Sequence, residues 1–199
     1  MNVRHLKKLN LSQTDISTDK MHTIIQCCPE LNDLNVGQCF DAPGDIIQAL
    51  TENSNALQHL TTLNLDLTRI STDQMHTIIQ CCPELNDLSI RCCSNAPAGM
   101  IQALQANSNA LQHLKILDLN STFTLNDQMH IIVEHCSQLK QLNVRNCYYA
   151  PVGIIQALKA NPNALQNLKT LILEKANSSV SVEQTDFIQK SLPHLQIDW

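Results

Sequence analysis

The 199-residue chain contains few aromatic residues and little glycine: aromatics make up 3% of it and glycine occurs four times, although 43% of its residues are hydrophobic. Its core must therefore be built from aliphatic side chains, which argues against a binding site lined by many aromatic anchors. The scarcity of glycine argues against a collagen-like chain, and the high hydrophobic content argues against a disordered one.

The chain also lacks an excess of positive charge and long apolar runs. Lysine and arginine number 13 against 18 acidic residues, which gives a net charge of −5 and argues against a general attraction to nucleic acid or to anionic membranes. No apolar stretch of signal-peptide length occurs at the N-terminus, and the longest uncharged run, residues 92–114, is too polar to cross a bilayer. We therefore predict neither a nucleic-acid nor a membrane partner.

A repeat explains this composition. The segment HLKKLNLSQTDIST at positions 5–18 returns in similar form at 59–72 and 113–126, and PELNDLNVGQC at 29–39 returns at 83–93 and 137–147. The two segments alternate along the chain, and we call one copy of both together a repeat pair. Each repeat pair contains two cores of the form L-x-x-L-x-L, in which valine or isoleucine can take the last position. The first leucines of these cores are Leu6, Leu31, Leu60, Leu85, Leu114, Leu139 and Leu168, and a partial core begins at Leu195. We therefore predict that residues 1–199 form a single repeat domain.

This pattern resembles the leucine-rich repeat family, L-x-x-L-x-L-x-x-N/C-x-L, over nearly the whole chain. Leu31, Leu34, Val36 and Cys39 match it, as do the equivalent positions of the later repeat pairs. The cysteine-bearing copies are similar to the cysteine-containing subclass found in the repeat region of F-box proteins, and the two alternating unit lengths resemble the ribonuclease-inhibitor type. The resemblance implies an α/β solenoid, a horseshoe with a parallel sheet on its concave side and helices on its convex side.

Physical considerations support the same architecture. Strands stack about 4.8 Å apart whereas packed helices need about 10 Å, so an array of strand–helix units bends with its strands inside. A helix after the first core is indicated by four apolar residues at helical spacing, Met21, Ile24, Ile25 and Cys28. Its N-terminal cap is expected at Ser17, Thr18 or Asp19.

The two units of a repeat pair differ in length. In the longer of the two, two residue types are predicted to mark the ends of the helix. Proline suits the first helical turn, and it is present there as Pro43, Pro97 and Pro151. Asparagine tolerates the left-handed backbone that often ends a helix, and we predict that conformation at Asn53, Asn107 and Asn161.

Repetition argues against catalysis and metal binding. Histidines and cysteines recur at equal positions in successive repeat pairs, whereas a catalytic histidine is normally one residue in one site. Equivalent cysteines two strands apart, roughly 10 Å, cannot form a disulfide or share a zinc ion. The motifs H-E-x-x-H, G-x-S-x-G, G-x-G-x-x-G and G-x-x-x-x-G-K-[ST] are absent. We predict no catalytic residue, no metal and no cofactor.

The nine cysteines are an odd number and accompany no secretion signal. They are predicted to be free thiols in a reducing, cytoplasmic compartment, which would be that of a host cell if the chain is a microbial effector. We predict that most of them are buried as small core side chains, and that Cys27, Cys81 and Cys92 are partly exposed.

Recognition is expected where the copies differ, because the scaffold requires only the shared residues. Three lysines occupy the same position in successive cores, Lys115, Lys140 and Lys169, and Gln141 follows the second of them. Like charges on neighbouring strands repel, and an acidic partner would relieve the repulsion. The alternative interpretation is that these lysines only keep an open sheet edge solvated.

Three further residues are predicted to contribute to the binding site. Arg145 follows one of the lysine-bearing strands, and Tyr148 and Tyr149 replace the pairs FD at 40–41 and SN at 94–95 of the earlier copies. Tyrosine and arginine are enriched at interface hot spots. The alternative interpretation is that at least one of the tyrosines is buried against the next helix.

We therefore predict a non-catalytic protein-interaction module that binds a protein or acidic peptide, of unidentified nature, on its concave face. One alternative is the substrate-recognition arm of a ubiquitin ligase, although the first core begins at Leu6 and leaves no room for an F-box. Another is an enzyme inhibitor of the ribonuclease-inhibitor type. A third is a structural solenoid that self-associates end to end through unpaired strand edges.

Overall fold

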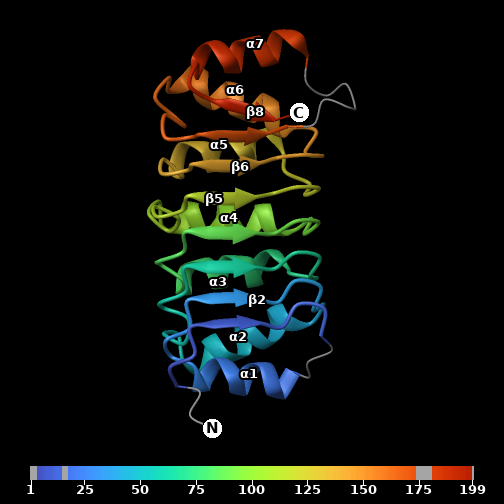
Figure 1. Ribbon diagram of the computed structural model, residues 1–199, viewed down its shortest axis with the longest axis vertical. Coiled ribbons are helices and arrows are strands. Elements are labelled where there is room, and N and C mark those ends of the chain that lie inside the picture. Colours follow the sequence, from blue (N-terminus) through green and yellow to red (C-terminus); the bar gives the residue numbers. More distant parts are fainter. Residues whose placement is uncertain (1–3, 15–17, 174–180, 199) are drawn as a thin grey trace.

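The computed structural model describes residues 4–14, 18–173 and 181–198. Short strands alternate with helices along this chain (Figure 1). The strands are β1 Lys8–Asn10, β2 Asp33–Asn35, β3 Thr62–Asn64, β4 Asp87–Ser89, β5 Ile116–Asp118, β6 Gln141–Asn143, β7 Thr170–Ile172 and β8 Gln196–Asp198. The helices are α1 Thr18–Cys27, α2 Ala42–Glu52, α3 Thr72–Cys81, α4 Ala96–Ala106, α5 Asn126–His135, α6 Ala150–Ala160 and α7 Val182–Ser191.

The strands form one parallel sheet whose spatial order is the sequence order. The central residues of neighbouring strands pair with each other, Leu9 with Leu34 at one end and Leu171 with Ile197 at the other. From β2 to β7 this central leucine is buried. Because successive side chains in a strand point to opposite faces, its two neighbours face outward. The predicted α/β solenoid is confirmed.

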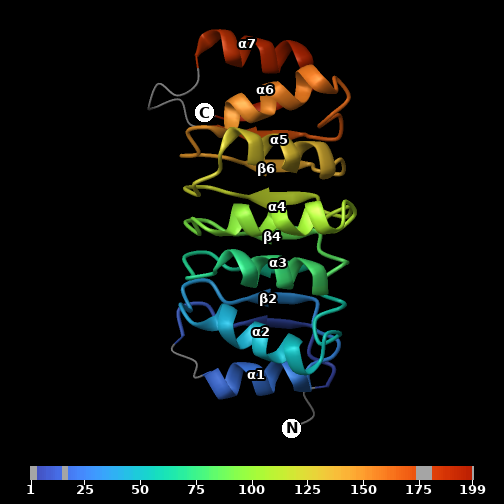
Figure 2. The ribbon, with the colours of Figure 1, turned by 180° about the vertical axis from the view of Figure 1, so that it is seen from behind.

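The helices of the described chain cover one face of the sheet only. They lie behind the strands in Figure 1 and in front of them in Figure 2, and each packs against the helix before and after it in the chain. The other face, which we call the sheet face, is the one that the strand and helix spacings place on the concave side. No helix in the described ranges has the length and hydropathy needed to span a bilayer.

The predicted helix starts are confirmed where the structure describes them. A proline occupies the first turn of α2, α4 and α6. Ser17, one of three candidate caps of α1, lies outside the described residues, as do the side chains of Thr18 and Asp19. The equivalent residue of α3, Ser71, forms a capping box, in which its Oγ accepts from the N–H of Gln74.

The left-handed helix ends predicted at three asparagines are wrong. Backbone φ at Asn53, Asn107 and Asn161 is −145°, −146° and −138°. The reason is a local hydrogen bond: Oδ1 of Asn107 accepts from the backbone N–H two residues later at 3.0 Å, and the other two asparagines do the same. Left-handed backbone occurs instead in the turn after each of β1 to β6, at Gln13, Gln38, Leu67, Cys92, Ser121 and Asn146, and at Leu165 in the loop between α6 and β7.

The cysteines divide as predicted, and all nine are free thiols. Cys27 and Cys92 are exposed, Cys81 is half-buried, and the remaining six are buried. Three of the buried thiols follow a strand, and each donates to the carbonyl oxygen of a leucine one repeat earlier. The distances are 2.9 Å for Cys39, 3.1 Å for Cys93 and 3.0 Å for Cys147. These contacts tie each turn to its neighbour.

Thiol reactivity should follow this burial, because only an accessible thiolate reacts. We expect a water-soluble disulfide reagent to modify Cys27 and Cys92 rapidly and Cys81 slowly, and the other six only in denaturant. Mass spectrometry of the native and the unfolded chain checks this count. The Cys27→Ser/Cys92→Ser variant should lose the rapid phase, and rapid modification of a buried thiol in the native chain would contradict the expectation.

Candidate functional site

Two rows of side chains project from the sheet face, one from the first and one from the third residue of each strand. The first row consists of Lys8, Asp33, Thr62, Asp87, Ile116, Gln141, Thr170 and Gln196. The second row consists of Asn10, Asn35, Asn64, Ser89, Asp118, Asn143, Ile172 and Asp198. The face is therefore polar, with apolar side chains only on β5 and β7.

The second row mainly holds the turns that follow the strands. Oδ1 of Asn35 accepts from the backbone N–H of Gly37 at 3.0 Å, and Oδ1 of Asn143 accepts from that of Arg145 at 3.1 Å. Asn143 also donates through Nδ2 to Asp118 at 3.0 Å, which links two strands. Because these polar atoms are already engaged, the first row is the part of the sheet face that is better suited to contact a partner.

Carboxylates gather on the first half of the sheet face. Asp33 lies 3.2 Å from the Lys8 ammonium, and Asp87 lies two strands further along. Partial burial raises the pKa of Asp87, and the charges of Asp33 and Asp118 raise it further. This half of the face is therefore weakly acidic.

The three predicted lysines lie directly before β5, β6 and β7, at the edge where the strands begin. They occupy successive rungs: the N–H of Lys140 donates to the carbonyl oxygen of Lys115 at 2.7 Å, and that of Lys169 to Lys140 at 2.8 Å. Their side chains are exposed, and none of them forms an ion pair with a described residue. We call these three residues the lysine ladder. Gln141 follows it in the first row of the sheet face.

The other predicted residues lie at the opposite edge, where the strands end. Arg145, Tyr148 and Tyr149 belong to the loop between β6 and α6, and all three are exposed. The exposed fractions are 54% for Tyr148 and 48% for Tyr149, so the burial of at least one tyrosine against the next helix is wrong. Buried residues on both sides, Cys147 and Ala150, hold the two tyrosines outward. The structure thus separates these three residues from the lysine ladder by the length of a strand.

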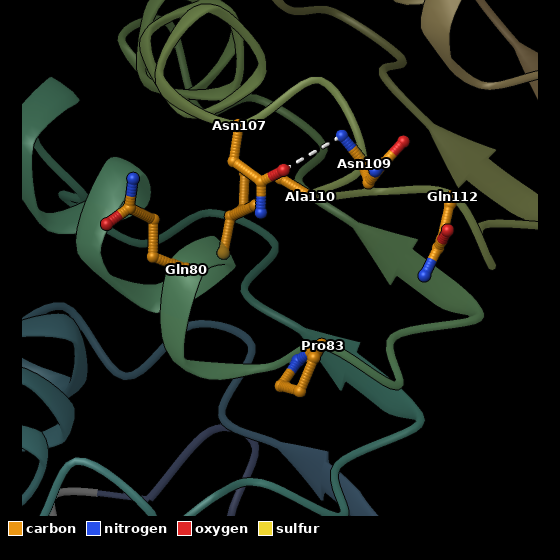
Figure 3. A pocket seen from close by; sticks show the side chains of 7 residues that line it. Gln80, Pro83, Asn107, Asn109, Ala110 and Gln112 are labelled. Carbon is orange, nitrogen blue, oxygen red and sulfur yellow. Dashed lines mark hydrogen bonds between the residues drawn. The ribbon is translucent and has the colours of Figure 1, made fainter.

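Two pockets lie away from the sheet face. One, of about 290 Å³, is lined by uncharged residues, Ile79, Gln80, Pro83, Asn107, Asn109, Ala110 and Gln112 (Figure 3). The other, of about 420 Å³, is lined by Phe40, Asp41, Pro43, Gly44, Asp45, Arg69 and Gln74. Neither contains a cysteine or histidine, and within the described ranges no group of three or more metal-ligating side chains is assembled.

No protein-family model matches the chain. Among solved structures, the leucine-rich repeat-containing protein LegL7 from Legionella pneumophila superposes with a TM-score of 0.59 at 20% identity, over 98% of this chain. The chain folds as a leucine-rich repeat solenoid. This solenoid spans 65% of the LegL7 chain. The Rad7 and Elc1 complex from yeast matches with a TM-score of 0.39 at 14% identity, over 98% of this chain and 76% of that chain.

Two exposed aromatic residues at the edge where the strands end, Phe40 and Phe123, were not singled out from the sequence alone. Phe123, in the loop after β5, is 61% exposed, and its ring lies 6.1 Å from that of Tyr149 at an interplanar angle of 78°. A signal was available, because Phe123 stands where the preceding repeat pair has Arg69. Arg69 itself lies 5.1 Å from the ring of Phe40.

Proposed function

We propose that this chain is a non-catalytic module that binds a protein partner on its sheet face. The observation that carries the proposal is that the helices of the described chain cover only the other face. Parallel sheets are usually covered on both faces. A broad, polar, uncovered parallel sheet is therefore best explained as a surface that another protein covers. Because its cysteines are free, we propose a reducing, cytoplasmic compartment for this function.

The lysine ladder and Gln141 suggest what kind of segment the partner presents at the strand-start edge. Three exposed lysines stand on successive rungs, so their backbones span about 10 Å along the sheet. Their mutual repulsion is weak in water, but an acidic segment along the ladder would convert it into attraction. We propose that the part of the partner over β5, β6 and β7 is acidic.

Charge reversal tests this function. We expect the Lys115→Glu/Lys140→Glu/Lys169→Glu variant to bind the partner about tenfold or more weakly than the wild type, because three attractive contacts become repulsive. Proteins captured from cell lysate by the immobilised wild type would be identified by mass spectrometry, and their affinity for each variant would be measured with the purified proteins.

The matched control is Lys20→Glu/Lys159→Glu/Lys190→Glu, which changes the net charge by the same amount on exposed residues of α1, α6 and α7. It should retain the wild-type affinity. Equal binding of the captured proteins to all three chains would show that the lysine ladder is not in the interface.

A further inference from the structure

We propose that the edge of the solenoid where β5 and β6 end is a second docking surface, which binds an acidic segment with apolar side chains from a partner protein. The surface consists of Phe123, Tyr148, Tyr149 and Arg145, and we call it the aromatic rim. The inference rests on the proposed function as a protein-binding module, but it names a different surface from the lysine ladder.

The rim exposes aromatic residues, which are scarce in this chain. The chain has only three phenylalanines, two tyrosines and one tryptophan, yet the rim contains Phe123 and both tyrosines at 48–61% exposure. Elsewhere the solenoid fills its core with leucine, isoleucine, methionine and cysteine. Large aromatic rings clustered on the surface are typical of protein interfaces, where they supply most of the binding energy.

The fold holds these rings outward. Phe123 stands between Thr122 and Thr124, which are 4% and 1% exposed and whose hydroxyl groups are 2.8 Å apart. Thr122 Oγ1 also donates to the carbonyl oxygen of Leu119 at 2.7 Å. Because both neighbours are fixed in the interior, the phenylalanine ring has to point to solvent. A rigid anchor of this kind loses little conformational entropy when it binds.

The two loops of the rim form one surface. The N–H of Ser121 donates to the carbonyl oxygen of Arg145 at 2.9 Å, and Asn146 Nδ2 donates to Ser121 Oγ at 3.2 Å. The edge-to-face contact between Phe123 and Tyr149 joins the same two loops further out. A partner segment would therefore meet a preformed patch and not two independent loops.

The charge around the rim identifies the occupant. The loops at residues 119–126 and 144–153 contain Arg145 and no acidic residue, and Arg91 lies in the preceding loop. Asp118 and Asp66 lie close to these loops, but their carboxylates already accept hydrogen bonds, Asp118 from Asn143 and Asp66 from the N–H of Arg91. Both arginines are exposed and form no ion pair with a described residue. Exposed arginines on the same edge as exposed aromatic rings complement a segment in which carboxylates alternate with apolar side chains.

The scaffold does not require this surface. In the preceding repeat pair, Ser94 and Asn95 stand at the positions of the two tyrosines, and Arg69 at that of Phe123. The turns there have the same backbone, with φ of 60° at Cys92 and 60° at Asn146. The fold therefore tolerates serine and asparagine at the tyrosine positions, and this tolerance supplies a test variant.

The probe is a phage-displayed library of random dodecapeptides, selected on the immobilised wild-type chain. We expect the selected peptides to combine aspartate or glutamate with leucine, isoleucine or aromatic residues. Fluorescence anisotropy with synthetic copies of these peptides should show about tenfold or more loss of affinity for the Tyr148→Ser/Tyr149→Asn variant. Phe40→Ser removes an equally exposed aromatic side chain outside the rim and should change the affinity less than about twofold.

Each of the following outcomes would overturn the aromatic rim as a docking surface. The selection could yield no peptide or only basic ones, the Tyr148→Ser/Tyr149→Asn variant could bind the peptides as well as the wild type, or the Phe40→Ser variant could lose them equally. Binding of labelled single-stranded DNA would be measured in the same way. If the wild type binds it and the Tyr148→Ser/Tyr149→Asn variant does not, while both bind the peptides equally, the rim is a nucleic-acid surface and the proposal fails. If the lysine-ladder variant loses affinity for the captured proteins and the tyrosine variant keeps its affinity for both proteins and peptides, the proposed function stands and the rim fails. If neither of these two variants loses affinity for proteins or peptides, both proposals fail.

Discussion

Replacing Gly153 by alanine is expected to lower the free energy of unfolding by about 2–3 kcal/mol. Gly153 is buried in the first turn of α6, where that helix packs against the start of α5. A Cβ atom built there would lie 2.7 Å from Cβ of Met129 and would clash with the backbone carbonyl oxygen of Asn126. A backbone atom cannot rotate away as a side chain can, so the two helices would have to separate.

The control for this substitution lies in α2. Gly44 is exposed, and a Cβ atom there would meet only Gln74 Nε2, at 3.9 Å. Gly44→Ala should therefore raise the free energy of unfolding by about 0.5–1 kcal/mol through helix propensity alone. Urea unfolding followed by circular dichroism measures both changes. Equal stability of Gly153→Ala and the wild type would show that α5 and α6 can separate without loss.

The helices α2, α4 and α6 do not all have glycine at the position of Gly153, so the repeat does not require glycine there. Gly99 of α4 is as closely packed as Gly153, since a Cβ atom there would lie 2.6 Å from Cβ of Met75. In α2 the equivalent residue is Asp45, which is 2% exposed. The contact between α1 and α2 therefore accommodates a side chain that the other two helix pairs exclude.

Most of the fold could be predicted from the repeat. Each copy of L-x-x-L-x-L places one leucine at the centre of a strand, and the pairing of Leu34 with Leu63 and of Leu63 with Leu88 follows from equal positions in successive copies. The burial of Cys93 and Cys147 followed from the same reasoning. The helix ends could not be predicted in this way, because an asparagine can end a helix in two ways. It can adopt left-handed backbone, or its side chain can accept a hydrogen bond from the backbone N–H two residues later. Asn107 takes the second.

The candidate site was harder to predict, for a geometrical reason. Lys140 and Arg145 are close in the sequence, but β6 lies between them and sends them to opposite edges of the sheet. Phe123 and Tyr149 are far apart in sequence, yet neighbouring repeats bring their rings together. Comparison of copies showed which residues vary, whereas their grouping depends on how the loops leave the strands.

Raising the pH from 8 to 10 is expected to lower the free energy of unfolding, and the two thiols of Cys82 and Cys136 by themselves account for about 3 kcal/mol of the decrease. Both thiols are fully buried. Burial raises the pKa of Cys136 from 9.0 to about 12. It raises that of Cys82 as well, with a smaller contribution from the neighbouring Cys81. Well below pH 9 these thiols are protonated in both the folded and the unfolded chain, so they give no pH dependence.

Above pH 9 the unfolded chain loses these two protons while the folded chain keeps them, so stability falls as pH rises toward the folded pKa. The loss approaches about 1.4 kcal/mol per thiol for each pH unit in this range. Urea unfolding at pH 8, 9 and 10 in the presence of a reductant measures it. The Cys82→Ala/Cys136→Ala variant should be less stable at pH 8 but should lose about 3 kcal/mol less than the wild type on going to pH 10. The Cys27→Ser/Cys92→Ser variant, which changes exposed thiols only, should keep the wild-type dependence. An unchanged pH dependence in the alanine variant would mean that the buried thiols titrate in the folded solenoid as they do in the unfolded chain.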